Sequence, residues 1–159
     1  MSASTTPAGL VIRPASEADL ERVVELLTLG APPGGRVPDE DPGDLAPYRR
    51  ALREIEAGDG DVLVAELDGR VVGIYQLIVF RHLQARGGRC AEIESVHVHP
   101  DQRGTGVGGA LMRDAVERAR ALGCYRVQLT SNAAREDAHR FYERLGFVPS
   151  HVGFKLLLS

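Results

Sequence analysis

The chain has 159 residues, 43% of them hydrophobic and 26% charged, and a formal net charge of −3 at pH 7. This size and composition are typical of one compact domain, and the acidic balance argues against a protein whose main task is to bind nucleic acid. No apolar run approaches the roughly 20 residues of a membrane-spanning helix, and the first residues lack the basic flank and apolar core of a signal peptide, so we expect neither a membrane protein nor a secreted one.

We expect a cytoplasmic protein in which residues 1–9 form a loose leader and residues 10–159 a single domain. The two cysteines, Cys90 and Cys124, are far apart in the sequence. Because they can form neither a disulfide framework nor a zinc cage, we expect no metal. Lys155 is the only lysine, and this arginine-rich usage is typical of a bacterial protein.

The first predicted elements are a strand and a helix. Residues 10–13 are rich in strand-forming side chains and end at Pro14. Ser16 is a suitable helix N-cap, with Asp19 at the third following position. Apolar residues then recur at helical spacing up to Gly30, and this predicts an amphipathic helix with the stripe Leu20, Val23, Val24 and Leu27.

A long loop and a hairpin come next. Residues 31–47 are rich in proline and glycine, too polar and too rigid for regular structure, and residues 48–57 have the pattern of a short helix. The β-rich runs 61–67 and 70–80 flank Asp68-Gly69, and this predicts two antiparallel strands joined by a tight turn.

The second half of the chain alternates strands and helices. The patterns predict a strand over 90–98, a helix over 110–122 with Gly123 as C-cap, a strand over 125–130, a helix over 135–145 ended by Gly146, and two short strands within 147–158. Together with the hairpin, this order predicts an α+β fold with a mostly antiparallel sheet.

The most informative stretch is the glycine-rich turn between the strand at 90–98 and the next helix. Glycines expose successive backbone N–H groups, and a helix N-terminus adds partial positive charge, so the turn can bind a phosphate or pyrophosphate. A connector without a ligand is the alternative. Gly104, Gly106 and Gly109 also satisfy the dinucleotide-binding pattern G-x-G-x-x-G. That pattern expects an acidic residue at the end of the following strand, and none occurs before Glu136, so we reject it.

Two motifs resemble those of the GNAT N-acetyltransferase superfamily. The segment Arg103-Gly-Thr-Gly-Val-Gly108 resembles the acyl-CoA-binding motif R-x-x-G-x-G. Asn132, followed by the run Ala138-His-Arg-Phe-Tyr-Glu-Arg-Leu-Gly-Phe147, resembles the second motif at the expected distance. The resemblance covers residues 10–158. It implies a GNAT-like sheet flanked by about four helices, acetyl-CoA as cosubstrate and an amine as acceptor.

The resemblance also implies which residues hold acetyl-CoA. Arg103 and the amides of the glycine turn would bind the pyrophosphate, and the strand before the turn would pair with pantetheine as if it were an added strand. A main-chain N–H near His97 and Val98 would polarise the thioester carbonyl. For Asn132 a helix N-cap is the alternative role. The implied binding residues are Val96, His97, Val98, Arg103, Gly104, Thr105, Gly106, Val107, Gly108, Gly109, Asn132, Ala138 and Tyr142.

Acetyl transfer to an amine needs a base, because a primary amine with a pKa near 10.4 is mostly protonated at neutral pH, and it benefits from an acid at the departing thiolate. Alternation places Glu92 and Glu94 on the same face as Val96 and Val98. We prefer Glu94 slightly over Glu92 as the base, with substrate binding or a purely structural role as alternatives. The resemblance implies Tyr142 as the acid, although its helical position also suits a core aromatic residue.

The acceptor would lie between the first two helices, their loop and the C-terminal strands, as the resemblance implies. The loop carries Asp39, Glu40, Asp41 and Asp44, which either attract a cationic amine or are simply solvated. Amino acids, polyamines, aminoglycoside-like compounds, xenobiotic amines and protein N-termini all stay open as acceptors.

Other partners and functions are less favoured. His97 and His99 are alternate strand residues without a third ligand, so we do not expect them to bind metal. We expect no nucleic-acid or membrane partner, and the resemblance allows a homodimer. The alternative function is a catalytically silent acyl-CoA-binding or regulatory module.

Overall fold

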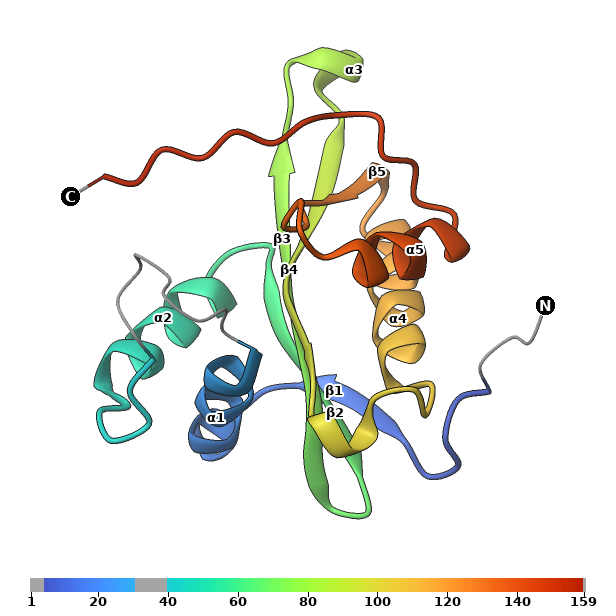
Figure 1. Cartoon of the computed structure of the whole chain (residues 1–159). Helices are drawn as coiled ribbons and strands as arrows, with labels where there is room; N and C mark the ends of the chain where they lie inside the picture. Colours follow the sequence, from blue (N-terminus) through green and yellow to red (C-terminus); the bar gives the residue numbers. More distant parts are fainter. Residues whose placement is uncertain (1–4, 31–39, 159) are drawn as a thin grey trace.

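A mixed five-stranded sheet forms the centre of the molecule (Figure 1). The computed structural model describes residues 5–30 and 40–158, so the first part of the predicted leader lies outside the described residues. The strands follow one another across the sheet in chain order, and every neighbouring pair is antiparallel except β4 and β5, which are parallel. They are β1 (Val11–Pro14), β2 (Asp61–Leu67), β3 (Arg70–Arg81), β4 (Arg89–Val98) and β5 (Cys124–Leu129).

Helices cover both faces of this sheet, α1 and α2 on one side and α4 and α5 on the other (Figure 1). A short turn, α3, closes the β3–β4 hairpin, and two 3-10 helices, η1 and η2, precede α1 and the glycine turn. Among the described helices, none is both long and apolar enough to cross a bilayer. The bounds are η1 (Glu17–Asp19), α1 (Leu20–Gly30), α2 (Ala46–Glu56), α3 (Gln84–Gly87), η2 (Pro100–Gln102), α4 (Val107–Ala121) and α5 (Glu136–Arg144). The expected α+β fold is confirmed.

Two apolar layers hold the helices on the sheet. The layer under α4 and α5 buries Leu63, Tyr75, Leu77, Ile93, Leu111 and Met112. The layer under α1 and α2 buries Leu20, Leu26, Leu52, Val64 and Ile74. Since strand side chains alternate between faces, the central strands contribute to both layers, which explains why their sequences are apolar almost throughout.

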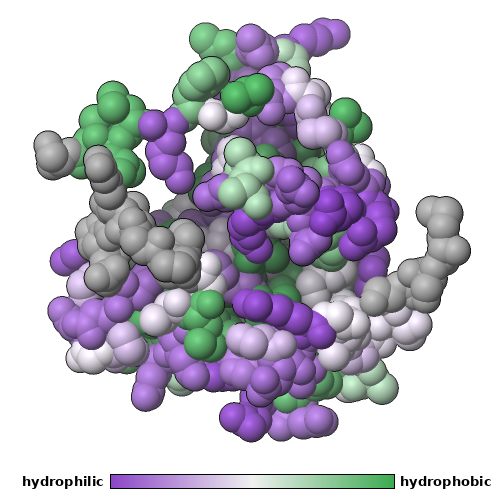
Figure 2. Space-filling view, in the orientation of Figure 1, coloured by the Kyte–Doolittle hydropathy of each residue, from purple (hydrophilic) through white to green (hydrophobic). Residues whose placement is uncertain are grey.

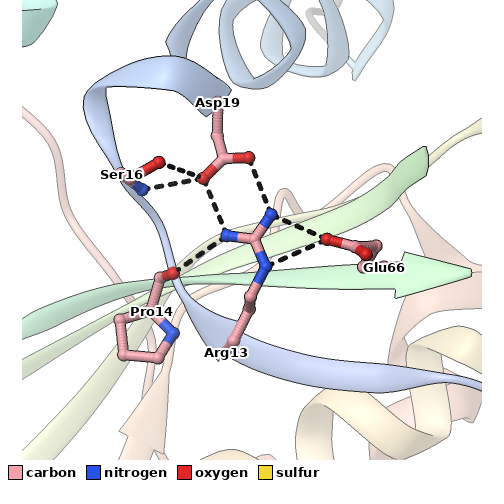
Figure 3. A network of polar contacts seen from close by, with 5 residues as sticks. All are labelled: Arg13, Pro14, Ser16, Asp19 and Glu66. Atoms are coloured by element: carbon pink, nitrogen blue, oxygen red, sulfur yellow. Dashed lines mark hydrogen bonds and ion pairs between the residues drawn. The ribbon is translucent and has the colours of Figure 1, made fainter. Parts of the chain in front are cut away.

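Arg13 connects the start of the first helix to the edge of the sheet (Figure 3). Its Nη1 and Nη2 donate to the two carboxylate oxygens of Asp19 at 2.8 and 2.9 Å, and its Nε donates to Oε2 of Glu66 at 3.0 Å. The predicted N-cap is also present, because the N–H of Ser16 donates to Oδ2 of Asp19 at 2.8 Å. The hydrogen bonds from Arg13 are the main cause that lowers the pKa of the buried Asp19 to about 2.

An Asp19→Asn variant is expected to lose on the order of 2 kcal/mol of unfolding free energy at neutral pH, because the charge-assisted bonds to Arg13 are lost. The folded pKa lies below the ordinary value of 3.8. The carboxylate therefore stabilises the fold above about pH 4, and this contribution disappears as the pH falls toward 2. Urea titrations between pH 2 and 7 measure the effect. The matched control is Glu117→Gln in an exposed ion pair with Arg120, which is expected to change stability little.

The tail after α5 does not form the two strands that its sequence pattern predicts over 147–158, so this prediction is wrong. Gly146 ends α5 with a φ of 91°, and Phe147 still packs against the core. Residues 148–158 are exposed and have no regular structure. Their alternating apolar pattern is typical of a strand, but within the described residues no strand pairs with them.

Candidate active site

β4 and β5 run side by side for only part of their length. Their parallel register extends from Arg89 opposite Cys124 to Ile93 opposite Leu129. β5 then ends, while β4 continues through residues 94–98 with no strand on that side in the described part of the chain. The hydrogen-bonding edge of β4 is therefore free over these residues.

The free edge presents backbone N–H groups to a ligand. The N–H of His99 donates to the carbonyl oxygen of Val72 on the β3 side, at 2.8 Å. Backbone groups alternate in direction along a strand, so the N–H groups of Val98 and Val96 point to the side where β5 has ended. An extended ligand can pair with β4 there as a further strand would.

A β-bulge at Ser95 interrupts β4 next to this edge. The register shifts between Ile74 and Gln76 of β3, so that two residues of β4 lie opposite Tyr75 alone. Ser95 adopts a φ of 52°, which is uncommon for a residue with a side chain. Strict alternation of side chains along the strand therefore fails at this point.

The bulge determines which side chains face the acceptor side. Glu94 pairs with Gln76 before the bulge and His97 pairs with Ile74 after it, and cross-strand partners share a face. Ile74 belongs to the layer under α1 and α2. That face thus carries Glu92, Glu94 and His97, whereas Val96 and Val98 pack into the layer under α4 and α5. The expectation that the two glutamates share a face with the two valines is wrong.

The glycine turn exposes backbone N–H groups beside the free edge. Gly104 and Gly106 have φ values of 76° and 100°, a region that strongly favours glycine. The N–H of Ala110 donates to the carbonyl oxygen of Gly106 at 3.0 Å, so the preceding N–H groups of α4 have no partner within the helix. These are the groups of Gly106, Val107, Gly108 and Gly109, and together they suit an anion.

Close packing brings this turn to β4 and α5. A Cβ atom on Gly108 would lie 3.5 Å from Cζ of Phe141 and 3.7 Å from Cγ2 of Val98. Arg103 in the turn and Arg135 before α5 are both exposed. Burial is the main cause that lowers the pKa of His97, and the charges of Arg135 and Arg103 lower it further. Both positive charges therefore lie on the side of the free β4 edge where His97 is. The hydroxyl of Thr105 is used within the turn, where it donates to the carbonyl oxygen of Gln102 at 2.7 Å.

Asn132 shapes the loop that leads from β5 to α5. Its Oδ1 accepts from the N–H of Ala134 at 2.9 Å, and its carbonyl oxygen accepts from the N–H of Arg135 at 3.0 Å. Asn132 therefore forms the turn ahead of the helix, while Arg135 occupies the N-cap position. Ala138 and Tyr142 lie one turn apart on α5 and share a face of that helix.

Tyr142 packs into the layer under α4 and α5, on the opposite face of the sheet from Glu94. The Tyr142 ring packs against Phe141 and Phe147, with ring centroids 5.2 and 6.1 Å apart. Burial is the main cause that raises the pKa of Tyr142, and the negative charge of Glu94 raises it further, whereas Arg135 lowers it. The free edge of β4 thus has an acid candidate on one side and a base candidate on the other.

The two glutamates have different surroundings. Glu92 lies on the part of β4 that is still paired with β5, and its Oε2 accepts from Nε2 of Gln128 at 2.9 Å. Glu94 lies one residue beyond the last β4–β5 pair. Burial, followed by the neighbouring Glu92, raises the pKa of Glu94, while the charge of Lys155 lowers it.

A cavity of about 130 Å³ lies between α1, α2 and the sheet, on the face that carries Glu94. Its wall is mainly apolar, with polar atoms from Tyr48, Gln76 and Ser95. Gln76 is the cross-strand partner of Glu94 and Ser95 is its chain neighbour, so the cavity adjoins this carboxyl. It lies on the face of the sheet that α1 and α2 cover.

The acidic loop is mostly engaged in local contacts, and Asp39 lies outside the described residues. The hydroxyl of Tyr48 donates to Oε2 of Glu40 at 2.6 Å. Asp41 and Asp44 each accept from the N–H two residues further on, at 2.8 and 3.1 Å. These two carboxylates therefore hold their own turns, and Glu40 is the one joined to a side chain of the cavity wall.

The described residues fit the expected acyl-CoA ligand. The free edge of β4 matches the amides of an extended pantetheine arm, and the N–H groups at the start of α4 match a pyrophosphate. In addition, Oγ of Ser131, between β5 and α5, is a buried polar atom without a hydrogen-bond partner in the described structure. A buried hydroxyl of this kind needs a partner, which a bound ligand would supply.

A metal site finds no support in the geometry. Within residues 5–30 and 40–158, no group of three or more His, Cys, Asp or Glu side chains could hold an ion. Cys90 and Cys124 are free thiols.

Sequence reasoning missed three residues of this region. Two of them could have been found from the sequence, because each is a polar residue that interrupts apolar sequence near a motif. They are Gln128 in the strand at 125–130 and Ser131 directly before Asn132. The bulge at Ser95 could not have been predicted, because its sequence fits a regular strand equally well.

Comparison with known proteins gives the family. The family described as "Acetyltransferase (GNAT) family" matches residues 21–147. A glucosamine 6-phosphate N-acetyltransferase of Trypanosoma brucei brucei is 37% identical over 141 residues, which cover 87% of this chain and 88% of the relative. An aminoalkylphosphonate N-acetyltransferase of Salmonella typhimurium is 39% identical over 87 residues, 55% of this chain and 56% of the relative.

Solved structures agree with this assignment. A protein of Bacillus halodurans C-125 described as a transcriptional regulator is 38% identical, with a TM-score of 0.86 over 94% of this chain and 99% of that one. An acetyltransferase of Trypanosoma brucei is 32% identical, with a TM-score of 0.76 over the same shares. The fold, the two motifs and these relatives together show that the chain belongs to the GNAT family of acetyltransferases, whose enzymes use acetyl-CoA as cosubstrate.

Proposed function

We propose that this N-acetyltransferase moves the acetyl group of acetyl-CoA to the primary amine of a small molecule by direct attack, with both substrates bound at once. The observation that carries the proposal is the free edge of β4 at residues 94–98, which lies beside the unpaired N–H groups at the start of α4. The cavity of about 130 Å³ beside Glu94 gives the amine a place to bind. The reaction needs no nucleic acid and no membrane.

The backbone of β4 and the glycine turn bind acetyl-CoA. Acetyl-CoA supplies the acetyl group as a thioester, which an amine can attack. The N–H groups at the start of α4, together with Arg103, hold the pyrophosphate, and the free edge of β4 aligns the pantetheine arm. The outward N–H of Val98 or Val96 then stabilises the negative charge that develops on the carbonyl oxygen.

Two side chains move the protons. Glu94, directly or through a water molecule, takes a proton from the amine, which frees the lone pair for attack on the acetyl carbon. As the new C–N bond forms and the C–S bond breaks, the Tyr142 hydroxyl donates its proton to the departing sulfur, and the positively charged nitrogen gives up a second proton to solvent. Solvent restores the tyrosine proton and removes the one on Glu94, so the products are an N-acetyl amine and a free thiol.

The first candidate acceptor is a small amine that also carries a phosphate or phosphonate group. Two relatives are named for such substrates, glucosamine 6-phosphate and aminoalkylphosphonates. On the acceptor face, Lys155 is close enough to lower the pKa of Glu94, and the exposed Arg126 flanks Glu92 and Gln128. These cations suit an oxyanion when the amine lies at Glu94.

A paired substrate panel tests the proposal. Thiol release from acetyl-CoA is measured with glucosamine 6-phosphate, 2-aminoethylphosphonate, and the counterparts that lack the anionic group, glucosamine and ethanolamine. We expect turnover of amines, with kcat/KM at least about tenfold higher for the phosphorylated or phosphonate member of each pair. Equal rates within each pair would refute the oxyanion preference. Binding of acetyl-CoA without acetylation of any amine in a broad panel would favour the silent acyl-CoA-binding module.

A Gly106→Ala variant is expected to weaken acetyl-CoA binding about tenfold or more. Its φ of 100° strains any residue with a Cβ, so the substitution displaces the N–H groups at the start of α4. Calorimetric titration with acetyl-CoA measures the loss. The matched control is Gly123→Ala at the other end of α4, where φ is 72° and an added Cβ meets nothing within 4 Å. A variant of Gly106 with unchanged affinity would contradict the pyrophosphate site.

A further inference from the structure

His97 and Glu94 lie next to each other on the acceptor face of β4. Glu94 pairs with Gln76 of β3, and His97 pairs with Ile74, two residues away from Gln76 on the same strand. Side chains two residues apart in a strand share a face and lie about 7 Å from each other. The bulge therefore brings two residues that are three apart in the sequence of β4 into adjacent positions on one face.

The cavity between α1, α2 and the sheet adjoins both side chains. Its wall includes Ile74 and Gln76, and these are the cross-strand partners of His97 and Glu94. The wall also includes Leu27, which lies about one turn before the end of α1. An amine bound in this cavity therefore has a carboxylate and an imidazole beside it.

The end of α1 holds the imidazole of His97 in place. A Cβ atom on Gly30, the last residue of the helix, would overlap Nδ1 and Cε1 of the ring, so this edge of the imidazole lies directly against the helix backbone. Only glycine leaves room for such a close approach. The partial negative charge at a helix C-terminus stabilises a protonated imidazole. The contact therefore orients the ring, leaves Nε2 to meet a substrate and helps the ring to hold a proton.

Charged side chains from three other segments act on His97. Burial is the main cause that lowers its pKa, the charges of Arg135 and Arg103 lower it further, and Glu40 raises it. The two arginines belong to the cosubstrate side, whereas Glu40 is joined to Tyr48 of the cavity wall. Hydrophilic residues border a hollow near the centre of Figure 2, on the face where β4 passes between α1 and α4 in Figure 1. With its pKa below the ordinary 6.5, His97 is neutral at neutral pH and can accept a proton.

We propose that His97 takes the second proton from the attacking nitrogen and passes it to solvent. The proposal rests on the proposed function, in which Glu94 takes the first proton and the nitrogen then bonds to the acetyl carbon. At that stage Glu94 still holds its proton and the nitrogen is positively charged. Nε2 of His97 accepts the proton from this nitrogen, and the electron pair of the N–H bond stays on the nitrogen. The C–S bond then breaks as the sulfur is protonated, and the imidazolium releases its proton to solvent.

The second proton suits an imidazole because it is more acidic than the first. The nitrogen has gained a bond to a carbon that carries oxygen and sulfur, and these atoms draw electrons away from it. A weak base is therefore sufficient to take this proton, and a weak base also returns it readily to solvent.

Removal of the ring and rescue with free imidazole test the proposal. Thiol release is measured with glucosamine 6-phosphate and 2-aminoethylphosphonate, and release without an amine is subtracted. A His97→Ala variant is expected to lose about 100-fold or more in kcat with unchanged acetyl-CoA affinity, because a positioned base contributes typically 10²–10⁴-fold and the backbone of β4 remains. Added imidazole should restore at least about tenfold of this loss, in proportion to the concentration of its unprotonated form.

The matched control is His82→Ala. This histidine is also half-buried, and its ring packs against Phe80 and Tyr125 just beyond the end of β3. The control is expected to keep wild-type kcat and to show no response to imidazole. Rescue confined to the His97 variant requires a ring nitrogen at the reacting atoms, which a purely structural role of His97 does not.

A Gly30→Ala variant displaces the ring without removing it. The added Cβ overlaps the imidazole, while alanine itself suits a helix. We expect a loss of about tenfold in kcat, and no further loss when Gly30→Ala is combined with His97→Ala, because the group that it displaces is then absent. Unchanged kcat in Gly30→Ala, or additive losses in the double variant, would overturn the proposal.

Activity of the wild type separates this inference from the proposed function. A wild type that acetylates no amine would overturn both. If the wild type acetylates the amines, wild-type kcat in His97→Ala, or a loss that imidazole does not reverse, would overturn only the proton transfer by His97.

Discussion

A Tyr142→Phe variant should bind acetyl-CoA with nearly unchanged affinity and lose about 100-fold or more in kcat. Protonation of a leaving group by a positioned acid contributes typically 10²–10⁴-fold. The ring stays in place in this variant because its contacts with Phe141 and Phe147 involve the aromatic faces and edges rather than the hydroxyl. Steady-state kinetics with a saturating amine and calorimetry with acetyl-CoA separate the two quantities.

The matched control removes a hydroxyl elsewhere. Tyr125 on β5 is 47% exposed and its ring lies under the guanidinium of Arg126, away from the free edge of β4. Tyr125→Phe is expected to keep wild-type kinetics. Wild-type kcat in Tyr142→Phe would remove the acid role and leave Tyr142 as a packing residue. A loss of acetyl-CoA affinity without a loss of kcat would make it a binding residue.

A Glu94→Gln variant should lose about 100-fold or more in kcat/KM at neutral pH and also lose the acid limb of the pH profile. The base acts only when it is deprotonated. Burial and the nearby Glu92 raise the pKa of Glu94 above its ordinary 4.5, so in the wild type the rate falls as the pH drops through this raised pKa. Rates between pH 5 and 9 with a constant-ionic-strength buffer show whether this limb exists.

Glu92→Gln distinguishes the two carboxyls. Removing the charge of Glu92 takes away one cause that raises the pKa of Glu94, so the acid limb is expected to move to lower pH. The amide can still pair with Gln128 across β4 and β5. If Glu92 were the base, its variant would lose the limb altogether, and Glu94→Gln would keep it. The pH profile therefore assigns the base more directly than the rate at a single pH.

The bulge at Ser95 links the fold to this chemistry. It directs Glu94 to the cavity side of the sheet and keeps Val96 and Val98 in the opposite apolar layer. A regular strand would place all four even-numbered side chains of residues 92–98 on one face. Glu94 would then share a face with Val96 and Val98. It could not point to the cavity while both valines pack under α4 and α5.

The sequence by itself determined the features that consecutive residues encode. The Asp68-Gly69 turn, the Ser16 and Asp19 cap and the glycine turn around Gly106 depend on backbone preferences of a few neighbouring side chains, and each is present. Together with the periodic spacing of apolar residues, they were sufficient to predict the α+β fold and the family. The residue roles at the site stay predictions from the motifs.

Tertiary structure decided how distant segments meet. The end of β4–β5 pairing after Ile93, the bond between Glu92 and Gln128 and the close approach of Gly108 to Phe141 all depend on residues from different parts of the chain. Residues 148–158 have the sequence pattern of a strand but form none, because a strand forms only where a neighbour supplies hydrogen bonds. Local preference fixes backbone conformation within a few residues, whereas register, face and electrostatic environment depend on packing between elements, which no single segment of sequence contains.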